Sequence, residues 1–183
     1  MSYPLKGSNY SNFVFCIEKN KWTEVGWSIE SEPYEILMDF KEFKVLEPII
    51  PQLVGIKKWG LFGCSSNEKW TSGNLALLGD SCHPMLPFLA QGANQALEDA
   101  HFVAKSLSGS SIARVADRLK IYSESRKKRV VRVQLASQLN ARIYHTKNPI
   151  LKLFLHNYLN IISKIAPNLL LSRFDWLYGY NPK

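Results

Sequence analysis

The chain has 183 residues, 46% of them hydrophobic and 21% charged, which is enough for one domain with a buried core or for two smaller pieces. Its net charge is +8, and the positive excess lies after residue 100. Three cysteines (Cys16, Cys64 and Cys82), an odd number without a CxxC pair, indicate neither a disulfide framework nor a zinc site, and they favour the reducing cytoplasm. No signal peptide is recognised, and polar residues interrupt the apolar stretch 149–171, so we expect no membrane span.

The first segment, residues 1–70, is predicted to be a strand-rich layer. Runs of β-branched and aromatic residues at 12–17, 22–29 and 56–62 predict strands. Between the second and the third run, a Ser-Glu-Pro sequence precedes an acidic, apolar stretch at 34–40, which predicts a short helix.

The second segment, residues 71–108, is predicted to form a strand, a loop and a helix. Residues 74–78 are apolar and predict a buried strand, and a helix is expected from about Asn94 to Leu107. The helix positions expected to face the core are Ala96, Leu97, Ala100, Ala104 and Leu107.

The third segment, residues 109–183, is predicted to be helical. A long helix over about 112–144 is expected to bury Ile112, Val115, Leu119, Tyr122, Val130, Val133 and Ser137. Its other face carries the basic residues Arg126–Arg129 and Arg132, which we expect to be solvated. Pro149 suits the first turn of a new amphipathic helix, and the aromatic end FDWLYGY is expected to pack.

The run GDSCHPMLPFLAQGANQALEDA, from Gly79 to Ala100, holds the residues most suited to chemistry. A carboxylate at a strand end (Asp80) can accept charge-assisted hydrogen bonds from ligand hydroxyls, although turn and capping roles are also common there. Pro84 and Pro87 stiffen the loop or are ordinary loop prolines. The amides at the helix start can face an electron-rich ligand edge, while Asn94 can also cap the helix.

Two further residues of this run are expected to be structural. His83 is interpreted as a hydrogen-bonded structural histidine, with a catalytic role as the less favoured alternative. Cys82 is interpreted as a small packed side chain, because no adjacent Lys or Arg lowers the pKa of its thiol. No residue is assigned a catalytic role, and no metal site is predicted.

The order of residues in this run resembles the second flavin-binding motif of the FAD-dependent aromatic hydroxylases, the group that includes salicylate hydroxylase and p-hydroxybenzoate hydroxylase. The start Tyr3-Pro4-Leu5, the helix 126–145 and the terminal FDWLYGY are also similar to the salicylate hydroxylase group. The resemblance implies that FAD is the cofactor, that NAD(P)H is the reductant, and that O2 and an aromatic small molecule are the substrates. The cofactor-binding residues that it implies are Gly79, Asp80, Pro84, Pro87, Gln91, Gly92, Ala93 and Asn94.

The sequence departs from this family in what it lacks. No GxGxxG follows a strand, the family's central Asp-Gly pair is missing, and Ser65-Ser66-Asn67 stand where relatives commonly have Pro and Arg. We therefore expect an α+β or α/β fragment: a strand-rich substrate-domain layer (1–70), a strand–loop–helix of the FAD-binding domain (71–108) and long C-terminal helices (109–183), without the N-terminal Rossmann βαβ unit.

Three alternatives remain open from the sequence. The chain is a non-catalytic remnant that binds no flavin, a basic helical module that binds an anionic partner through residues 126–132, or half of a split enzyme whose Rossmann half is a separate chain. Nucleic-acid binding is not favoured, because no aromatic interleaving or nucleic-acid motif accompanies the positive charge.

Overall fold

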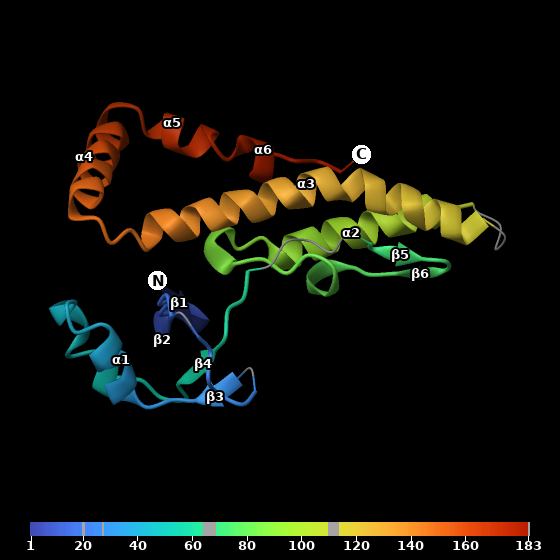
Figure 1. Ribbon diagram of the computed structural model, residues 1–183. Coiled ribbons are helices and arrows are strands. Elements are labelled where there is room, and N and C mark those ends of the chain that lie inside the picture. The colour runs from blue at the N-terminus through green and yellow to red at the C-terminus, as the bar shows by residue number, and fades with distance from the viewer. Residues whose placement is uncertain (20, 27, 64–68, 110–113, 183) are drawn as a thin grey trace. The chain divides into compact units, whose positions relative to one another are not determined.

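The computed structural model describes residues 1–19, 21–26, 28–63, 69–109 and 114–182 (Figure 1). The chain divides into two compact units, Met1–Leu61 and Phe62–Lys183. The predicted features at Cys64, Ser65-Ser66-Asn67 and Ile112 lie outside the described residues.

The first unit consists of two antiparallel two-stranded sheets and short helices. In chain order its elements are β1 (Ser2–Leu5), η1 (Lys6–Ser8), β2 (Tyr10–Phe13), β3 (Ser28–Glu30), α1 (Pro33–Asp39), η2 (Lys44–Leu46), η3 (Ile50–Gln52) and β4 (Lys57–Trp59). Strand β1 pairs with β2, from Ser2 opposite Phe13 to Leu5 opposite Tyr10. Strand β3 pairs with β4, with Ile29 opposite Lys58.

Aromatic side chains form much of the packing in the first unit. The Phe15 and Phe40 rings lie 5.3 Å apart, and Phe13 and Phe43 extend the cluster on either side. Ile50 is fully buried. The helix predicted at 34–40 is confirmed as α1, whereas the strands predicted at 12–17, 22–29 and 56–62 are shorter than expected because backbone pairing covers only part of each run.

The second unit consists of one hairpin and five α-helices among its described residues. Its elements are β5 (Thr71–Ser72), β6 (Leu75–Ala76), η4 (Gly79–Ser81), η5 (Pro87–Leu89), α2 (Gly92–Leu107), α3 (Val115–Tyr144), α4 (Pro149–Ile165), α5 (Pro167–Ser172) and α6 (Asp175–Tyr178). Helix α3 packs along α2 and also contacts η5 and the β5–β6 hairpin (Figure 1). The predicted long helix and the helix beginning at Pro149 are confirmed, and Asn148 caps the latter.

Two apolar clusters lie against α3. Trp70, Cys82, Tyr122 and Val130 form the first. Leu89, Val133 and Leu177 form the second, with Phe174 and Trp176 packed against it. The predicted buried positions Leu119, Tyr122, Val130, Val133 and Ser137 of α3 are confirmed, and so is the packing of the terminal aromatic segment.

The predicted core face of α2 is wrong at three of its five positions, whereas Ala96 and Leu107 are partly buried. Leu97 is 70% exposed, and Ala100 and Ala104 are also exposed, whereas Gln95 and Asp99 are fully buried. The reason is that α3 presents a buried arginine, Arg126, to this side of α2, so the buried positions must carry hydrogen-bond acceptors. The predicted buried strand 74–78 is also wrong, because β6 spans Leu75–Ala76 alone and Leu75 is 59% exposed.

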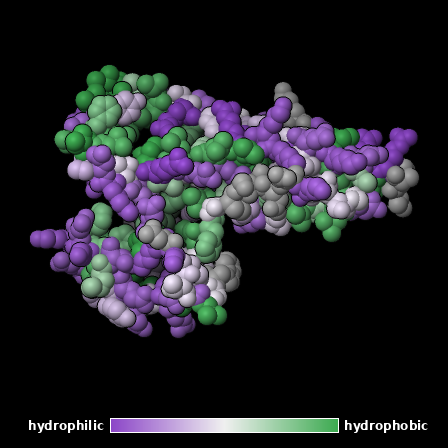
Figure 2. Space-filling model, in the orientation of Figure 1, coloured by the Kyte–Doolittle hydropathy of each residue, from purple (hydrophilic) through white to green (hydrophobic). Residues whose placement is uncertain are grey.

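Helix α4 presents apolar side chains to the surface. Figure 2 shows hydrophobic residues gathered over α4 and α5, and among them Ile150 and Ile165 are each more than three-quarters exposed. The helix is amphipathic as predicted, with Asn, His and Lys residues interrupting the apolar positions. No helix in the described part of the chain is long and apolar enough to cross a membrane.

Candidate functional site

The turn after β6 depends on glycine at position 79. Gly79 is buried and has φ +56°, a left-handed conformation that side chains other than glycine rarely adopt. A Cβ atom at this position would lie 3.1 Å from the Ala96 Cβ on α2. The turn therefore approaches α2 more closely than any side chain at residue 79 would allow, and it places Asp80 beside the start of that helix.

The Asp80 carboxylate lies next to the N-terminus of α2. Its side chain is exposed, and Oδ1 is 3.8 Å from the point where a Cβ on Gly92 would stand. None of the described residues donates a hydrogen bond to this carboxylate. The turn thus brings an acidic side chain and a helix N-terminus together, although they are twelve positions apart in the sequence.

The N-terminus of α2 has free backbone donors. The first helical hydrogen bond runs from the Gln95 amide to the Gln91 carbonyl, at 2.8 Å, and no side chain of the described residues caps the end. The amides of Gly92, Ala93 and Asn94 therefore remain available, at the positive end of the helix dipole. The alternative that Asn94 caps the helix is wrong, because Asn94 lies inside the helix.

The predicted binding residue Gln91 is oriented differently from the others. Its side chain is 3% exposed, and its Oε1 accepts a hydrogen bond from Gln95 Nε2 at 3.3 Å. Ala90 before it has φ +51°, so the chain turns sharply as it enters α2. Gln91 thus shapes the helix start from within the protein.

The proline loop is held by a row of polar side chains on α3 that the sequence reasoning missed. Gln134, Ser137 and Asn140 follow one another at three-residue spacing and lie on one face of the helix. They donate to alternate backbone carbonyls of the loop, those of residues 84, 86 and 88, at 2.9, 2.6 and 3.2 Å. A recurrent polar position within a buried helical face is the sequence signal that could have revealed them.

This row fixes the loop that carries both predicted prolines. Pro84 is half-buried, whereas Pro87 is exposed and begins η5. The Tyr178 hydroxyl adds a hydrogen bond to the Leu89 carbonyl at 3.3 Å, so the C-terminal segment also supports the loop. The loop is therefore held by α3 and by the C-terminal segment.

His83 and Cys82 are buried, as the sequence interpretation expected. His83 Nε2 is 2.6 Å from Asp99 Oδ2, and because a carboxylate only accepts, Nε2 carries the hydrogen. His83 Nδ1 has no hydrogen-bond partner among the described residues. Burial and the nearby Asp99 charge raise the pKa of the Cys82 thiol to about 12, which makes it a poor nucleophile.

Behind the turn lies a network of buried charges. Arg126 is fully buried; its Nε donates to Asp99 Oδ1 at 2.8 Å, its Nη2 donates to Gln95 Oε1 at 2.7 Å, and its Nη1 contacts Glu98. Arg129 donates to both oxygens of Glu98, at 2.7 and 2.8 Å. The prediction of a solvated basic face is therefore wrong at Arg126, because two acidic residues of α2 need a buried cation opposite them.

The network keeps both carboxylates charged. Burial alone raises the pKa of Asp99, but the hydrogen bonds from its donors outweigh burial and lower the pKa below the ordinary aspartate value. The pKa of Glu98 is likewise lowered, since burial is outweighed by Arg129 and Arg126. Cys82, His83 and Asp99 lie close enough to suggest a metal site, but a cation there would face Arg126, and both oxygens of Asp99 already accept hydrogen bonds. These residues do not fit a metal ion.

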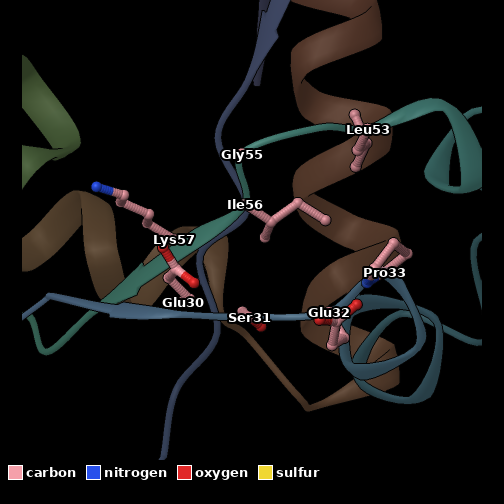
Figure 3. A pocket seen from close by; sticks show the side chains of 8 residues that line it. All are labelled: Glu30, Ser31, Glu32, Pro33, Leu53, Gly55, Ile56 and Lys57. Carbon is pink, nitrogen blue, oxygen red and sulfur yellow. The ribbon is translucent and has the colours of Figure 1, made fainter.

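The first unit has a cleft of its own. It encloses about 320 Å³ and is lined by Glu30, Ser31, Glu32, Pro33, Leu53, Gly55, Ile56 and Lys57. Figure 3 shows the Lys57 side chain pointing away from Leu53 and Pro33, on the other side of the cleft. No residue of the Gly79–Asn94 motif lines this cleft, so we assign it no chemistry.

Comparison with known proteins decides the family. The sequence model of the family described as FAD binding domain matches residues 1–137, three-quarters of the chain and the whole Gly79–Ala100 run. The chain belongs to this FAD-binding domain family. FAD is thus the cofactor of the family, as the sequence resemblance implied.

Relatives of this FAD-binding domain are named as monooxygenases and hydroxylases, some of them as FAD-dependent. The chain is 33% identical over 145 residues to a 3-amino-4-hydroxybenzoate 2-monooxygenase, PtnB3, of Streptomyces platensis. This match covers 79% of the chain and 36% of the relative. It is 29% identical over 185 residues to 3-hydroxybenzoate 6-hydroxylase 2 of Aquipseudomonas alcaligenes. That match covers 98% of the chain and 54% of the relative. The chain therefore spans about a third to a half of the length of these relatives.

The fold agrees with this membership. A solved structure titled salicylate hydroxylase substrate complex matches 99% of the chain and 44% of its own length, with a TM-score of 0.74 and 24% sequence identity. The predicted mixed class of helices and strands is confirmed at this level, as a helix-rich chain with small sheets. Within the FAD-binding domain the motif residues fit a flavin, because an exposed carboxylate lies beside a helix end with free amides.

Proposed function

We propose that this FAD-binding domain supplies the flavin-contacting turn and loop of a monooxygenase that hydroxylates a small aromatic compound with NAD(P)H and O2. The observation that carries the proposal is the exposed Asp80 carboxylate beside the uncapped N-terminus of α2. A carboxylate suits the hydroxyl groups of a ribityl chain, and free amides suit the electron-rich edge of a flavin ring.

Each motif residue then has a defined role. Gly79 allows the turn, and Asp80 accepts hydrogen bonds from the ribityl hydroxyls. The amides of Gly92, Ala93 and Asn94 donate to the pyrimidine edge of the flavin and stabilise negative charge there. When bound, the flavin supplies the redox chemistry with O2, while the protein orients the cofactor and excludes water.

The proline loop provides rigidity in this proposal. Pro84 and Pro87 restrict the backbone of this loop, and Gln91 holds the loop end against Gln95. We assign residues 1–70 to a substrate-binding layer, 71–108 to the returning part of the FAD-binding domain, and 109–183 to its helical support.

The aromatic substrate is proposed to be a benzoate-like acid or a phenol, since relatives are named for hydroxybenzoates. The adenosine part of FAD is proposed to bind a Rossmann-type segment outside these 183 residues, because the chain contains no GxGxxG. This segment belongs either to the same protein or to a separate chain. A cytoplasmic location is proposed together with this activity.

The test is an FAD titration of the chain, monitored by flavin fluorescence and visible absorbance. Asp80→Ala is expected to raise the Kd for FAD about tenfold or more, because it removes a charge-assisted acceptor. Asp117→Ala is the matched control, since this exposed aspartate pairs only weakly with Lys120, at 3.8 Å. It removes the same charge and should change the Kd less than about twofold.

Two outcomes contradict the proposal. If the folded chain binds no FAD, the non-catalytic remnant becomes the better description. If both aspartate variants weaken binding equally, net charge and not the turn is responsible. Where FAD binds, adding a Rossmann-type partner chain and measuring NAD(P)H oxidation with an aromatic acid separates a split enzyme from a single-chain one.

The basic helical module is not favoured. Arg126 is fully buried, and Arg129 holds Glu98 while its guanidinium also stacks on Tyr180 at 3.6 Å. These arginines therefore have partners within the protein and are not free to bind a polyanion. Steep salt-dependent binding to nucleic acid or anionic vesicles would contradict this conclusion.

A further inference from the structure

The Asp99 carboxylate, on α2, forms hydrogen bonds both with the Gly79 turn and with α3. It is fully buried, and its Oδ2 accepts the Gly79 backbone N–H at 3.0 Å and His83 Nε2–H at 2.6 Å. Its Oδ1 accepts Arg126 Nε–H at 2.8 Å. One side chain of α2 therefore binds the first residue of the turn, a histidine four residues further on, and the neighbouring helix.

The contact with Gly79 matters because of its place in the chain. Gly79 directly precedes Asp80, and its left-handed backbone conformation brings the turn against Ala96, one helical turn before Asp99. The Gly79 amide is buried and needs an acceptor there. A charged acceptor gives the stronger hydrogen bond, and Arg126 keeps that acceptor fixed and ionised.

We infer that Asp99 is a positioning residue that holds the Gly79–Asp80 turn in its binding geometry, with Arg126 and His83 fixing its carboxylate. Its link to FAD rests on the function proposed above. Asp99 does not contact the flavin in this assignment; it acts through the backbone of Gly79. The inference predicts that losing this one carboxylate loosens the turn more than it loosens the rest of the unit.

Glu98 provides a matched control on the adjacent residue. It is also a carboxylate of α2 that accepts hydrogen bonds from buried arginines, and it is 13% exposed. Its partners are Arg126, Arg129 and Gln95, so it has no bond to the turn. Asp99→Asn and Glu98→Gln each replace a carboxylate oxygen with an amide NH2, which cannot accept a hydrogen bond from the surrounding donors. Only Asp99→Asn changes a group that is bonded directly to the turn.

The first measurement is amide hydrogen exchange of the 183-residue chain by NMR, without cofactor. The amides of α3 serve as the reference for a general loss of stability. Relative to them, Asp99→Asn is expected to raise the exchange rate of the amides of residues 79–83 about tenfold. Glu98→Gln, which is linked to the turn only through Arg126, is expected to raise that rate much less. Equal changes in both variants would overturn the inference, because they would show a general loss of stability.

The second measurement is FAD binding by the same variants. Asp99→Asn is expected to raise the Kd about tenfold and to alter the visible absorbance of bound flavin, with little effect from Glu98→Gln. An unchanged Kd and spectrum in Asp99→Asn would overturn the link to the cofactor. If the unmodified chain binds no FAD, the proposed function fails, while the exchange experiment still decides the role of Asp99 in the turn.

A third measurement needs no variant and covers the case in which Asp99→Asn does not fold. Because the Gly79 amide donates to Asp99, its proton resonance must follow the titration of the Asp99 carboxyl with a shared midpoint. His83 and Arg126 also face this carboxyl, and their side-chain resonances serve as further reporters. If the chemical shift of the Gly79 amide proton does not change as the Asp99 carboxyl titrates, the inference is overturned.

Discussion

Replacing Gly79 with alanine tests how closely the turn approaches α2. The change forces a side chain into the left-handed conformation at φ +56°, which costs about 1–2 kcal/mol. The new Cβ would also stand 3.1 Å from Ala96 Cβ, where carbon atoms prefer about 3.5–4.0 Å. Displacing the turn or the helix adds about 1–3 kcal/mol, so the total loss in the free energy of unfolding is about 2–5 kcal/mol.

The chain contains a matched control for this change. Gly73, in the β5–β6 turn, also has φ +56°, but a Cβ there would meet no atom within 4 Å. Gly73→Ala should therefore lose only the conformational part, about 1–2 kcal/mol. The measurement is urea unfolding monitored by far-ultraviolet circular dichroism, which reports mainly on the helices of the second unit.

A double variant isolates the contact between the turn and the helix. Ala96→Gly removes the Cβ that Gly79→Ala would meet, and the next nearest atom, Ala96 Cα, is 3.9 Å away. Alone, Ala96→Gly should lower the free energy of unfolding by about 1 kcal/mol, because glycine is a poor helix former. Combined with Gly79→Ala, it should relieve the contact and restore about 1–3 kcal/mol of the free energy that Gly79→Ala loses. Losses in Gly79→Ala and Gly73→Ala that agree within about 0.5 kcal/mol would refute the close approach.

Three other experiments test the buried charges and the buried thiol of the second unit. Arg126→Met leaves two acidic groups without their buried cation and should lower the free energy of unfolding by about 3–5 kcal/mol; a loss below about 1 kcal/mol in urea unfolding contradicts this. Because the folded pKa values of Asp99 and Glu98 are lowered, their stabilisation is complete above the ordinary values and is lost as pH falls through the folded ones. The urea midpoint should therefore stay level from neutral pH down to about pH 4.5 and decrease as the pH is lowered further, and this decrease should be less steep in Asp99→Asn; equal slopes would contradict the assignment. The Cys82 thiol, with its pKa raised to about 12, should resist alkylation in the native chain and react on unfolding, as mass spectrometry will show; native labelling of Cys82 would contradict its burial.

The polar row on α3 shows where sequence reasoning stopped. The apolar periodicity of α3 predicted its length and most of its buried positions, including Ser137. The periodicity did not show that Ser137 donates to the Leu86 carbonyl, or that Gln134 and Asn140 do the same for neighbouring carbonyls. A hydrogen bond to a loop about fifty positions away depends on how the loop is placed, and local pattern does not report that placement.

The sequence by itself determined the family, the motif and the long helices. Local propensity and spacing are sufficient for these, because a helix, a tight glycine turn and a recognisable order of motif residues depend on neighbours in the chain. The long helix α3 and the helix that begins at Pro149 follow from that local chemistry.

Only the tertiary structure decided which face of α2 is buried and what Arg126 does. Hydrophobic periodicity favoured the alanine and leucine positions of α2, yet Asp99 and Gln95 are buried because a charged partner lies on α3, 27 and 31 positions further along the chain. A buried charge is stable only when its partner is in place, and the pairing of two helices brings that partner. For this reason the arginine that appears solvated in the sequence holds the turn from inside the protein.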